Sequence, residues 1–328
     1  MAKRKKKCLI IRYAAYGDML IVTPIIRLLH KRGYKVDIET KQSGKIILKN
    51  NPFINKIILH KQELDGKELE AHWKEIGKGY DKVINLTESI EASLALVPWQ
   101  KEYNLSQEER REMCDVNYYE RTFELAKMKF IPGLTGEIYF TPYEMDKARR
   151  SYSRYKNKFV ILWGLAGSSM HKAWPYMEYA ARAFMDAHED VVIFTVGDDI
   201  CRLLEFDHPN VKQKCGKWGM RHSIAFAQYA NLVIGTDTGF SHGAGIWRTP
   251  QILLLSAQSE ENISKHWRNC VTLTSEASCY PCFKLHYGLE TCELNENRLP
   301  KCMAELMPGK VLNAMEDVYK EWRATNGI

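Results

Sequence analysis

Residues 8–39 read CLIIRYAAYGDMLIVTPIIRLLHKRGYKVDIE and decide the fold. The apolar residues at the start of this stretch predict a buried strand, and the run at 35–39 predicts a second one. Between them, the helical spacing of apolar residues from 19 to 32 predicts a helix, which Gly33 ends. A strand, a helix and a second strand form a βαβ unit, so this stretch predicts an α/β fold with a parallel sheet.

The second half of the chain repeats this pattern, and one hydrophobic core rarely serves a chain of 328 residues. Further strands are predicted at 57–59, 83–86, 159–163, 191–196, 232–235 and 252–255. A helix is predicted at 174–187, with Pro175 in its first turn, where proline is tolerated. We expect an N-terminal domain at 1–152 and a C-terminal domain at 153–328. The last helix, at about 310–323, is expected to pack back on the N-terminal domain.

The composition is that of an ordinary soluble globular protein, with 45% hydrophobic and 27% charged residues. No apolar run approaches the roughly 18–20 residues that span a bilayer, and the run at 8–11 is too short for a signal peptide. We therefore expect a cytoplasmic location. The net charge of +7 is a mild excess that suits an anionic partner. The basic residues 1–7 either form a solvated tail or contact the inner membrane surface peripherally.

Two common nucleotide-binding motifs are missing from the sequence. The chain contains neither G-x-G-x-x-G nor G-x-x-x-x-G-K-[ST], and Gly44-Lys45 lacks the other residues of a P-loop. This argues against a nicotinamide-dependent dehydrogenase and against a P-loop kinase.

Three loops follow predicted strands, and ligands of open α/β sheets bind beyond the carboxyl ends of the strands. The first loop is Tyr13–Asp18, in which Gly17 permits a tight path and Asp18 places a carboxylate at a helix N-terminus. Asp18 is either an N-cap residue or a general base that faces a cleft.

The other two loops lie in the second half and both lead into predicted helices. Gly164–Lys172 is small and rich in hydroxyl groups, and Lys172 adds a positive charge. The second of these loops is Asp237–His242. Each is either an ordinary turn into a capped helix or a phosphate cradle, because helix N-termini present free N–H groups to anions. Two such loops in one domain can together hold a diphosphate.

These three loops, in this order, resemble those of glycosyltransferase family 9, the ADP-heptose:lipopolysaccharide heptosyltransferases. The resemblance spans roughly residues 8–318. It rests on Ile10-Ile11-Arg12 with Gly17-Asp18-Met19-Leu20 and Thr23-Pro24, on Gly167-Ser168-Ser169 with Lys172, Trp174 and Pro175, and on Asp237-Thr238-Gly239 with His242 and Pro250. Two features depart from the family pattern: Tyr13-Ala14-Ala15-Tyr16 before the Gly-Asp pair, and the bulky Trp247.

The resemblance implies a GT-B fold, in which two Rossmann-like domains with parallel sheets face each other across a cleft. It implies inversion at the anomeric carbon without a catalytic metal or other cofactor. Asp18 would deprotonate the acceptor hydroxyl, in an acceptor loop with Tyr13, Tyr16 and Gly17.

The resemblance also implies a donor site for a nucleoside-diphosphate sugar, with an ADP-sugar favoured. The donor residues would be Ser168, Ser169, Lys172, Asp237, Thr238, Gly239 and His242. In this set Ser168, Ser169 and Lys172 would hold the leaving diphosphate, Asp237 would contact the sugar, and the backbone at Thr238 and Gly239 would contact the phosphates.

The sequence leaves three functions open. The first is an inverting glycosyltransferase that moves a heptose or hexose onto lipopolysaccharide core or a related glycolipid. The second keeps the fold but glycosylates a modified DNA base, a protein or a small molecule, with Lys147–Lys158 as a nucleic-acid surface or a solvated linker helix. The third is a non-catalytic relative that binds nucleotide or carbohydrate, against which the intact Asp18, Lys172 and Asp237 argue.

Four of the nine cysteines gather near the C-terminus as Cys279-x-x-Cys282, Cys292 and Cys302. A C-x-x-C turn presents two thiolates to one metal ion, and two more thiolates complete a tetrahedral site. The polar segment between them lacks the apolar residues of a core, and a metal would supply the missing stabilisation. We predict one structural Zn²⁺ outside the catalytic cleft. An iron–sulfur cluster, four reduced cysteines or one redox-active pair remain alternatives.

Overall fold

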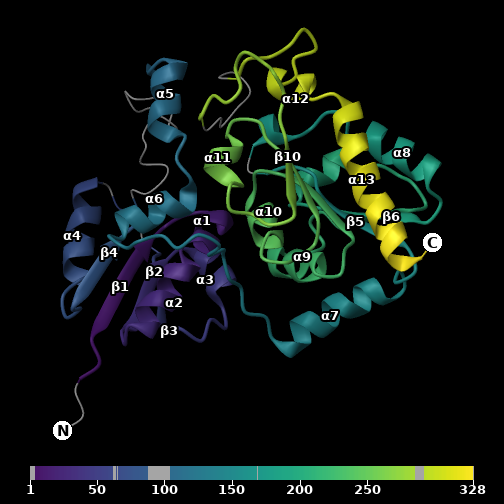
Figure 1. Ribbon diagram of the computed structural model, residues 1–328. Coiled ribbons are helices and arrows are strands. Elements are labelled where there is room, and N and C mark those ends of the chain that lie inside the picture. Colours follow the sequence, from purple (N-terminus) through teal and green to yellow (C-terminus); the bar gives the residue numbers. More distant parts are fainter. Residues whose placement is uncertain are drawn as a thin grey trace. The chain divides into compact units, whose positions relative to one another are not determined.

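The computed structural model describes residues 4–61, 64, 66–87, 104–167, 169–284 and 292–327. The chain forms two compact units, and most of their helices and strands are labelled in Figure 1. Unit 1 consists of Met1–Ala92 and Tyr118–Tyr139, and unit 2 of Ser93–Asn117 and Phe140–Ile328.

This division differs from the expected one at 152/153, because α7 (Pro142–Ser153) packs within unit 2. Glu144 of α7 accepts from Arg221 Nε at 2.6 Å, and Phe140 stacks on Trp247 at a centroid distance of 6.0 Å. Helix α5 (Gln107–Cys114) also belongs to unit 2, although the chain returns to unit 1 directly after it, at Tyr118.

Unit 1 is built on a four-stranded parallel sheet of order β3-β2-β1-β4. Its strands are β1 (Lys7–Arg12), β2 (Lys35–Thr40), β3 (Ile54–Leu59) and β4 (Lys82–Asn85). β1 lies in the centre and is buried at five of its six positions, which explains its continuous apolar run. The helices of unit 1 are α1 (Tyr16–Ile21), α2 (Thr23–Lys31), α3 (Gln42–Leu48), α4 (Gly66–Ile76) and α6 (Tyr118–Leu125).

The single helix expected at 19–32 is in fact two, α1 and α2. Pro24 occupies the first turn of α2. A proline at that position lacks the N–H that would continue the helix from α1, so the chain restarts at Thr23. Gly33 ends α2 as expected, with a φ of +86° that favours glycine.

Unit 2 is built on a six-stranded parallel sheet of order β10-β9-β8-β5-β6-β7. Its strands are β5 (Phe159–Gly164), β6 (Val191–Val196), β7 (Val211–Gln213), β8 (Leu232–Thr236), β9 (Gln251–Leu254) and β10 (Cys270–Leu273). Numbered within the unit, this order is 3-2-1-4-5-6 read from β7, the order of the Rossmann fold. The direction in which successive strands are added to the sheet therefore reverses between β5 and β8, the two central strands, which are parallel.

The remaining helices cover this sheet, and one of them starts later than expected. They are η3 (Met170–Lys172), α8 (Met177–Ala187), η4 (Ile200–Leu204), α9 (Met220–Ala227), α10 (Gly239–Ala244), α11 (Glu260–Ile263), α12 (Lys301–Glu305) and α13 (Pro308–Asn326). The helix expected from Trp174 begins at Met177, so Pro175 precedes it. The Trp174 ring is buried, and its Nε1 donates to Leu306 O at 2.8 Å, which ties it to the loop between α12 and α13.

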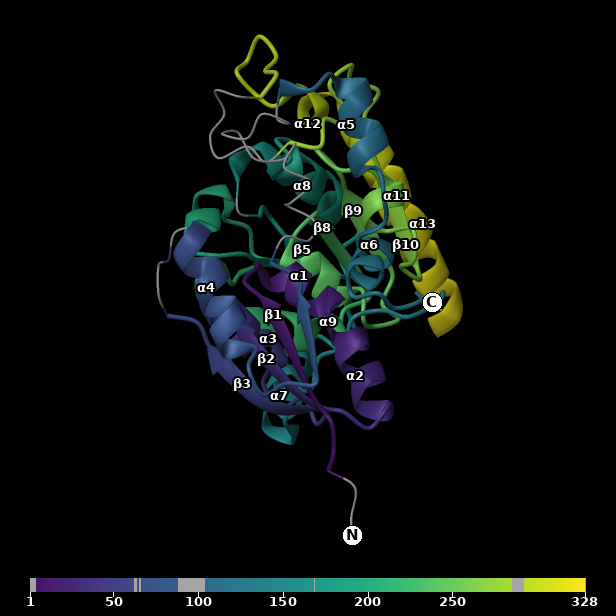
Figure 2. The ribbon, with the colours of Figure 1, turned by 90° about the vertical axis from the view of Figure 1, so that its left-hand side faces the viewer.

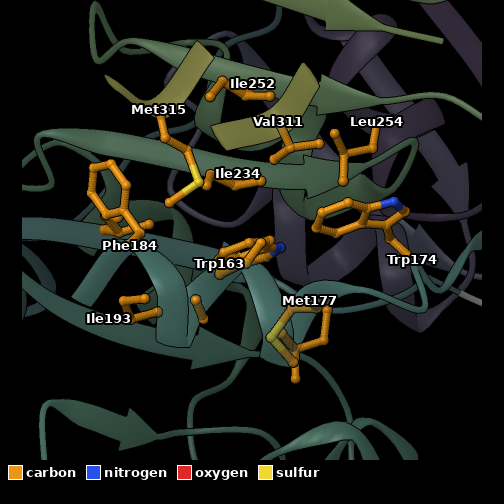
Figure 3. Close-up of a cluster of buried hydrophobic side chains, with 14 of the residues drawn as sticks. Trp163, Trp174, Met177, Phe184, Ile193, Ile234, Ile252, Leu254, Val311 and Met315 are labelled. Atoms are coloured by element: carbon orange, nitrogen blue, oxygen red, sulfur yellow. The ribbon is translucent and has the colours of Figure 1, made fainter. Parts of the chain in front are cut away.

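Figure 3 shows the core between the sheet of unit 2 and its helices, where Trp163, Ile193 and Ile234 meet Phe184 of α8 and Met315 of α13. Alternate residues of β5 point to this face because side chains alternate along a strand. The last helix thus contributes its apolar face to the core of unit 2, where it contacts α8, β9 and β10 (Figures 1 and 2). Among the described residues, no helix combines the length and apolar character needed to cross a membrane.

Candidate functional site

The first loop places Asp18 in the first turn of α1, directly beyond the central strand of unit 1. Arg12, the last residue of β1, is fully buried, and its Nη2 donates to Asp18 Oδ1 at 2.8 Å. Nη1 of the same guanidinium donates to Leu86 O at 2.9 Å. Arg12 therefore holds one carboxylate oxygen from inside the unit, while the described residues give the other oxygen, Oδ2, no hydrogen bond.

Asp18 is not an N-cap residue, so this alternative is wrong. The cap position of α1 is Ala15, whose side chain makes no capping bond. Asp18 lies three residues further on, where a carboxylate still interacts favourably with the positive end of a helix.

The other residues of this loop have different surroundings. Tyr13 donates from its hydroxyl to Glu39 Oε2 at 2.5 Å, and its ring stacks on His60 with centroids 4.3 Å apart. Burial and the neighbouring Glu39 raise the pKa of Tyr13 well above its usual range. Tyr16 is half-buried and Gly17 is buried in α1. Of the predicted acceptor loop, Tyr13 is thus tied to β2, whereas Gly17 and Asp18 belong to the first turn of α1.

The second and third loops meet in unit 2 because they follow β5 and β8, the strands on either side of the switch point. Gly167 makes this approach possible: a Cβ at this position would lie 2.8 Å from Thr238 Cγ2. Ligands of Rossmann-like sheets bind at such a switch point. The sequence-predicted donor residues are therefore brought to one place, apart from Ser168, which lies outside the described residues.

Lys172, Asp237 and His242 form one hydrogen-bonded and ionic group. Lys172 Nζ donates to Asp237 O at 2.8 Å and lies 3.1 Å from Asp237 Oδ2, while His242 Nε2 lies 3.4 Å from Oδ1. Burial alone would raise the pKa of Asp237, but Lys172 and His242 hold it well below its usual range. Both oxygens of this carboxylate are engaged, so it fixes the Lys172 ammonium group in place.

The remaining donor-loop residues form local contacts. Ser169 Oγ lies 2.6 Å from His171 Nδ1, and the His171 ring is buried. Thr238 is the N-cap of α10, and its hydroxyl accepts from Ser241 N at 3.3 Å. Gly239 opens α10, whose first N–H groups have no partner within the helix. The capped helix start is therefore present, and it is compatible with anion binding.

The four C-terminal cysteines line one cavity of about 180 Å³ in unit 2. Its other lining residues are Gln107, Arg110, His171, Ala257, Lys284 and Glu293. His171 belongs to the donor loop, so the cavity adjoins that loop. Within the described part of the chain, no three cysteine sulfurs lie within 4.8 Å of one another, whereas sulfurs on one Zn²⁺ lie about 3.8 Å apart for bonds of about 2.3 Å. The donor set is that of a Cys₄ metal site, but the sulfurs must move closer to bind one ion.

The thiols of this cavity interact with one another. A hydrogen bond from Cys302 lowers the pKa of Cys279 to about 7, and the same bond raises that of Cys302. Burial raises the pKa of Cys292 to about 12 and also raises that of Cys282. Without a bound metal, Cys279 is thus the most acidic of the four thiols.

Sequence reasoning gave no role to Arg12, and it missed a cluster of Glu39, His60 and His72 in unit 1. Glu39 Oε1 lies 2.7 Å from His72 Nε2 and 3.3 Å from His60 Nδ1. The available signals were charged residues at the ends of apolar strands, in β1 for Arg12 and in β2 for Glu39. Their partners lie 6 to 74 positions away along the chain, and local patterns do not reveal such pairings.

The sequence model of glycosyltransferase family 9 (heptosyltransferase) matches residues 69–291. No curated protein sequence matches the chain. The fold is similar to that of a family 9 glycosyltransferase from Veillonella parvula, with a TM-score of 0.68, 16% identity and coverage of 98% of this chain and 99% of the other. The fold is also similar to that of ADP-heptose lipopolysaccharide heptosyltransferase II of E. coli. The TM-score is 0.67 at 17% identity, with coverage of 97% of this chain and 99% of the other.

A third similar structure is the dodecameric iron-containing heptosyltransferase TibC in complex with ADP-D-β-D-heptose. Its TM-score is 0.60 at 11% identity, with coverage of 97% of this chain and 76% of the other. At such identities the likeness shows the fold alone. The expected α/β fold of GT-B type, with two Rossmann-like parallel sheets, is confirmed.

Proposed function

The chain belongs to glycosyltransferase family 9, and from this premise we propose that it is an inverting glycosyltransferase. It moves a heptose or hexose from a nucleoside-diphosphate sugar to a hydroxyl group of lipopolysaccharide core or a related glycolipid. The observation that carries this proposal is the group of Lys172, Asp237 and His242 at the switch point of unit 2.

The donor side of the reaction uses this group to hold the leaving diphosphate. The Lys172 ammonium group, fixed by Asp237, supplies a positive charge beside the first N–H groups of α10. Such donors stabilise the negative charge that develops on the departing phosphate. They do so effectively because they are already oriented toward it and need no reorganisation during the reaction. Ser168 and Ser169 add hydroxyl donors to the same loop. We favour an ADP-sugar, because similar structures are named for ADP-heptose or hold it.

The acceptor side uses Asp18 as the general base. Asp18 Oδ2, which accepts no hydrogen bond among the described residues, takes the proton of the acceptor hydroxyl while the hydroxyl oxygen of the acceptor forms a bond to the anomeric carbon. The bond from the anomeric carbon to the diphosphate breaks on the opposite side, and the diphosphate leaves with the electron pair. One displacement of this kind inverts the configuration.

Catalysis by this route needs no metal ion at the diphosphate, because Lys172 and the N–H groups of the loop compensate the negative charge of the diphosphate. A thermal-shift panel with ADP, UDP, GDP and CDP tests the donor assignment, since a bound nucleotide raises the unfolding temperature by mass action. ADP should give the largest shift, with or without a chelator. A larger shift with another nucleotide would reassign the donor base, and no shift with any would contradict the donor site.

The acceptor can be tested by turnover of ADP-sugar with lipopolysaccharide core, DNA or protein acceptors. Two basic side chains of the stretch considered for DNA already have an acidic partner: in α7, Arg149 and Arg150 both pair with Asp146, at 2.7 and 3.0 Å. Salt-sensitive DNA binding would favour the nucleic-acid alternative. Nucleotide binding without turnover on any acceptor would favour a non-catalytic relative.

We further propose that the basic N-terminus contacts the anionic surface of the inner membrane from the cytoplasm. Lys5 and Lys6 are exposed, whereas Arg4 pairs with Asp81 at 2.6 Å. Each exposed lysine adds on the order of 1 kcal/mol of attraction to an anionic bilayer. Co-sedimentation with anionic vesicles, but not with neutral ones, is the expected result. Equal recovery in the supernatant of both mixtures would reject the contact.

The four cysteines around the cavity are proposed to bind one structural metal ion, with Zn²⁺ as the first assignment. Coordination would deprotonate the thiols and draw the sulfurs together. TibC, which is similar in fold, is described as iron-containing, so iron is the alternative. Elemental analysis of protein purified without chelator should give at least about one equivalent of metal. Less than about a tenth of an equivalent, with all four thiols freely titratable in the folded protein, would refute the site.

A further inference from the structure

A second group of metal-ligand side chains lies in unit 1, whereas the four C-terminal cysteines and the donor loops belong to unit 2. Glu39 comes from β2, His60 follows the last residue of β3, and His72 lies on α4. Their ligand atoms all lie within 4.8 Å of one another. Among the described residues, this is the one group of three or more His, Cys, Asp or Glu side chains that meets this spacing.

The geometry of the group is close to that of three ligands on one ion. Ligand atoms at about 2.0–2.1 Å from a tetrahedral Zn²⁺ lie about 3.3 Å from one another. Glu39 Oε1 and His60 Nδ1 are already 3.3 Å apart. His72 Nε2 is 2.7 Å from Oε1 and must move outward by about 0.6 Å. The His72 side chain is 25% exposed, which leaves room for this movement.

Among the described residues, no lysine or arginine pairs with the Glu39 carboxylate. The Glu39 side chain is 2% exposed, and in the described part of the chain its ion-pair partners are the two imidazoles. A buried carboxylate is costly unless a charge or several hydrogen bonds compensate it. Contacts with Tyr13, His60 and His72 compensate part of this cost, and a divalent ion between the carboxylate and two neutral imidazoles would add an opposite charge.

Tyr13 supports the group from outside. Its hydroxyl donates to Glu39 Oε2, which leaves Oε1 for the two histidines, and its ring stacks on His60. Hydrogen bonds that orient ligating carboxylates are a regular feature of metal sites. The His60 ring is thereby fixed on one side by Tyr13, and it meets the His72 ring at a centroid distance of 5.1 Å.

We propose that Glu39, His60 and His72 bind one divalent transition-metal ion, such as Zn²⁺. Two imidazoles and one carboxylate suit such an ion and leave a coordination position for water or a ligand oxygen. Since Tyr13 links Glu39 to the loop that carries Asp18, the ion would also order that loop. The proposal stands independently of the glycosyl transfer proposed above.

The test is binding of Co²⁺, a spectroscopic substitute for Zn²⁺, to chelator-treated full-length protein. Wild type should bind one equivalent more than His72→Ala, and the difference spectrum should show d–d bands without a thiolate charge-transfer band. Because the cysteines are unchanged in both proteins, the difference isolates the histidine site. Glu39→Gln should weaken this binding at least about 100-fold, and Tyr13→Phe about 10–100-fold, as for a residue that orients a ligand.

His30→Ala is the matched control, since His30 is an exposed histidine of the same unit. It should bind Co²⁺ as wild type does. Metal should also raise the unfolding temperature of wild type and His30→Ala more than that of His72→Ala. Equal Co²⁺ stoichiometry and identical spectra for wild type, His72→Ala and Glu39→Gln would overturn the proposal and leave the group as a hydrogen-bonded network.

Discussion

Asp18 in unit 1 and Asp237 in unit 2 both lie beyond the carboxyl end of a central strand, and both pair with a cation. They differ in how many oxygens are held. Arg12 holds one oxygen of Asp18, and Oδ2 has no partner among the described residues. Lys172 and His242 hold both oxygens of Asp237. A general base needs an oxygen that can accept a proton, so Asp18 suits that role, whereas Asp237 suits that of a fixed anchor.

The largest expected effect is on turnover when Asp18 loses its basicity. Asp18→Asn keeps the shape and can still accept from Arg12, but it cannot take a proton from an acceptor hydroxyl. Turnover per folded enzyme should fall by about 10²–10⁴ with little change in ADP affinity, because a base acts in the transition state. Asp186→Asn, at an exposed aspartate of α8, should keep full activity. Near-normal turnover of Asp18→Asn would remove Asp18 from the mechanism.

A second large effect is expected on stability when Arg12 is removed. Arg12→Met leaves the Asp18 carboxylate and the Leu86 carbonyl without their buried donor. The free energy of unfolding should fall by about 3–5 kcal/mol, as when one partner of a buried ion pair is lost. Urea unfolding followed by circular dichroism measures this.

The control for Arg12→Met is Lys78→Met, which removes an ion pair with Glu75 whose side chains are both more than 70% exposed. Its effect should stay below about 1 kcal/mol. If Arg12→Met also costs less than this, the guanidinium does not hold Asp18 from inside, and the contrast between the two carboxylates weakens.

An intermediate effect is expected on donor binding when Lys172 is removed. Lys172→Ala removes the ammonium group that Asp237 holds in place. We propose that this group binds the diphosphate. Charge-assisted hydrogen bonds of about 1.5–3 kcal/mol would be lost, so the Kd for ADP should rise about 10–100-fold. Calorimetry with ADP measures it, with the exposed Lys217→Ala as control. An unchanged Kd would mean that Lys172 serves Asp237 alone.

Most of the fold was predictable because its signals are local. The buried strands are continuous apolar runs. Both ends of β6 were predicted correctly, because a polar turn precedes the strand and Gly197 follows it. The break between α1 and α2 was missed because the apolar periodicity continues through Pro24. The start of α8 was placed three residues early because a long-range bond from Trp174 to Leu306, not a local signal, sets the path there.

The candidate site was predictable only in part, because some of its contacts join residues that are far apart in the sequence. Glycines, hydroxyl residues and Lys172 after strands mark the donor loops in the sequence itself. That Lys172 is tied to Asp237, 65 positions away, follows from strands β5 and β8 lying side by side. The pairing of Glu39 with His60 and His72 likewise depends on the order of β2, β3 and α4 in space. Sequence spacing carries no information on such contacts until the topology is known.

The smallest expected effect is on the acid dependence of stability, and it tests whether both oxygens of Asp237 are engaged. The folded-state pKa of Asp237 lies below its ordinary value of 3.8. A lowered folded pKa means that the ion pair with Lys172 stabilises fully above about pH 3.8 and that this stability is lost as the pH falls further. Between pH 5 and 2 wild type should therefore lose about 1–2 kcal/mol more free energy of unfolding than Asp237→Asn. Asp186→Asn should follow the wild-type curve. Parallel curves for wild type and Asp237→Asn would show that Lys172 and His242 do not hold this carboxylate, and Asp237 would then be as free as Asp18 to act as a base.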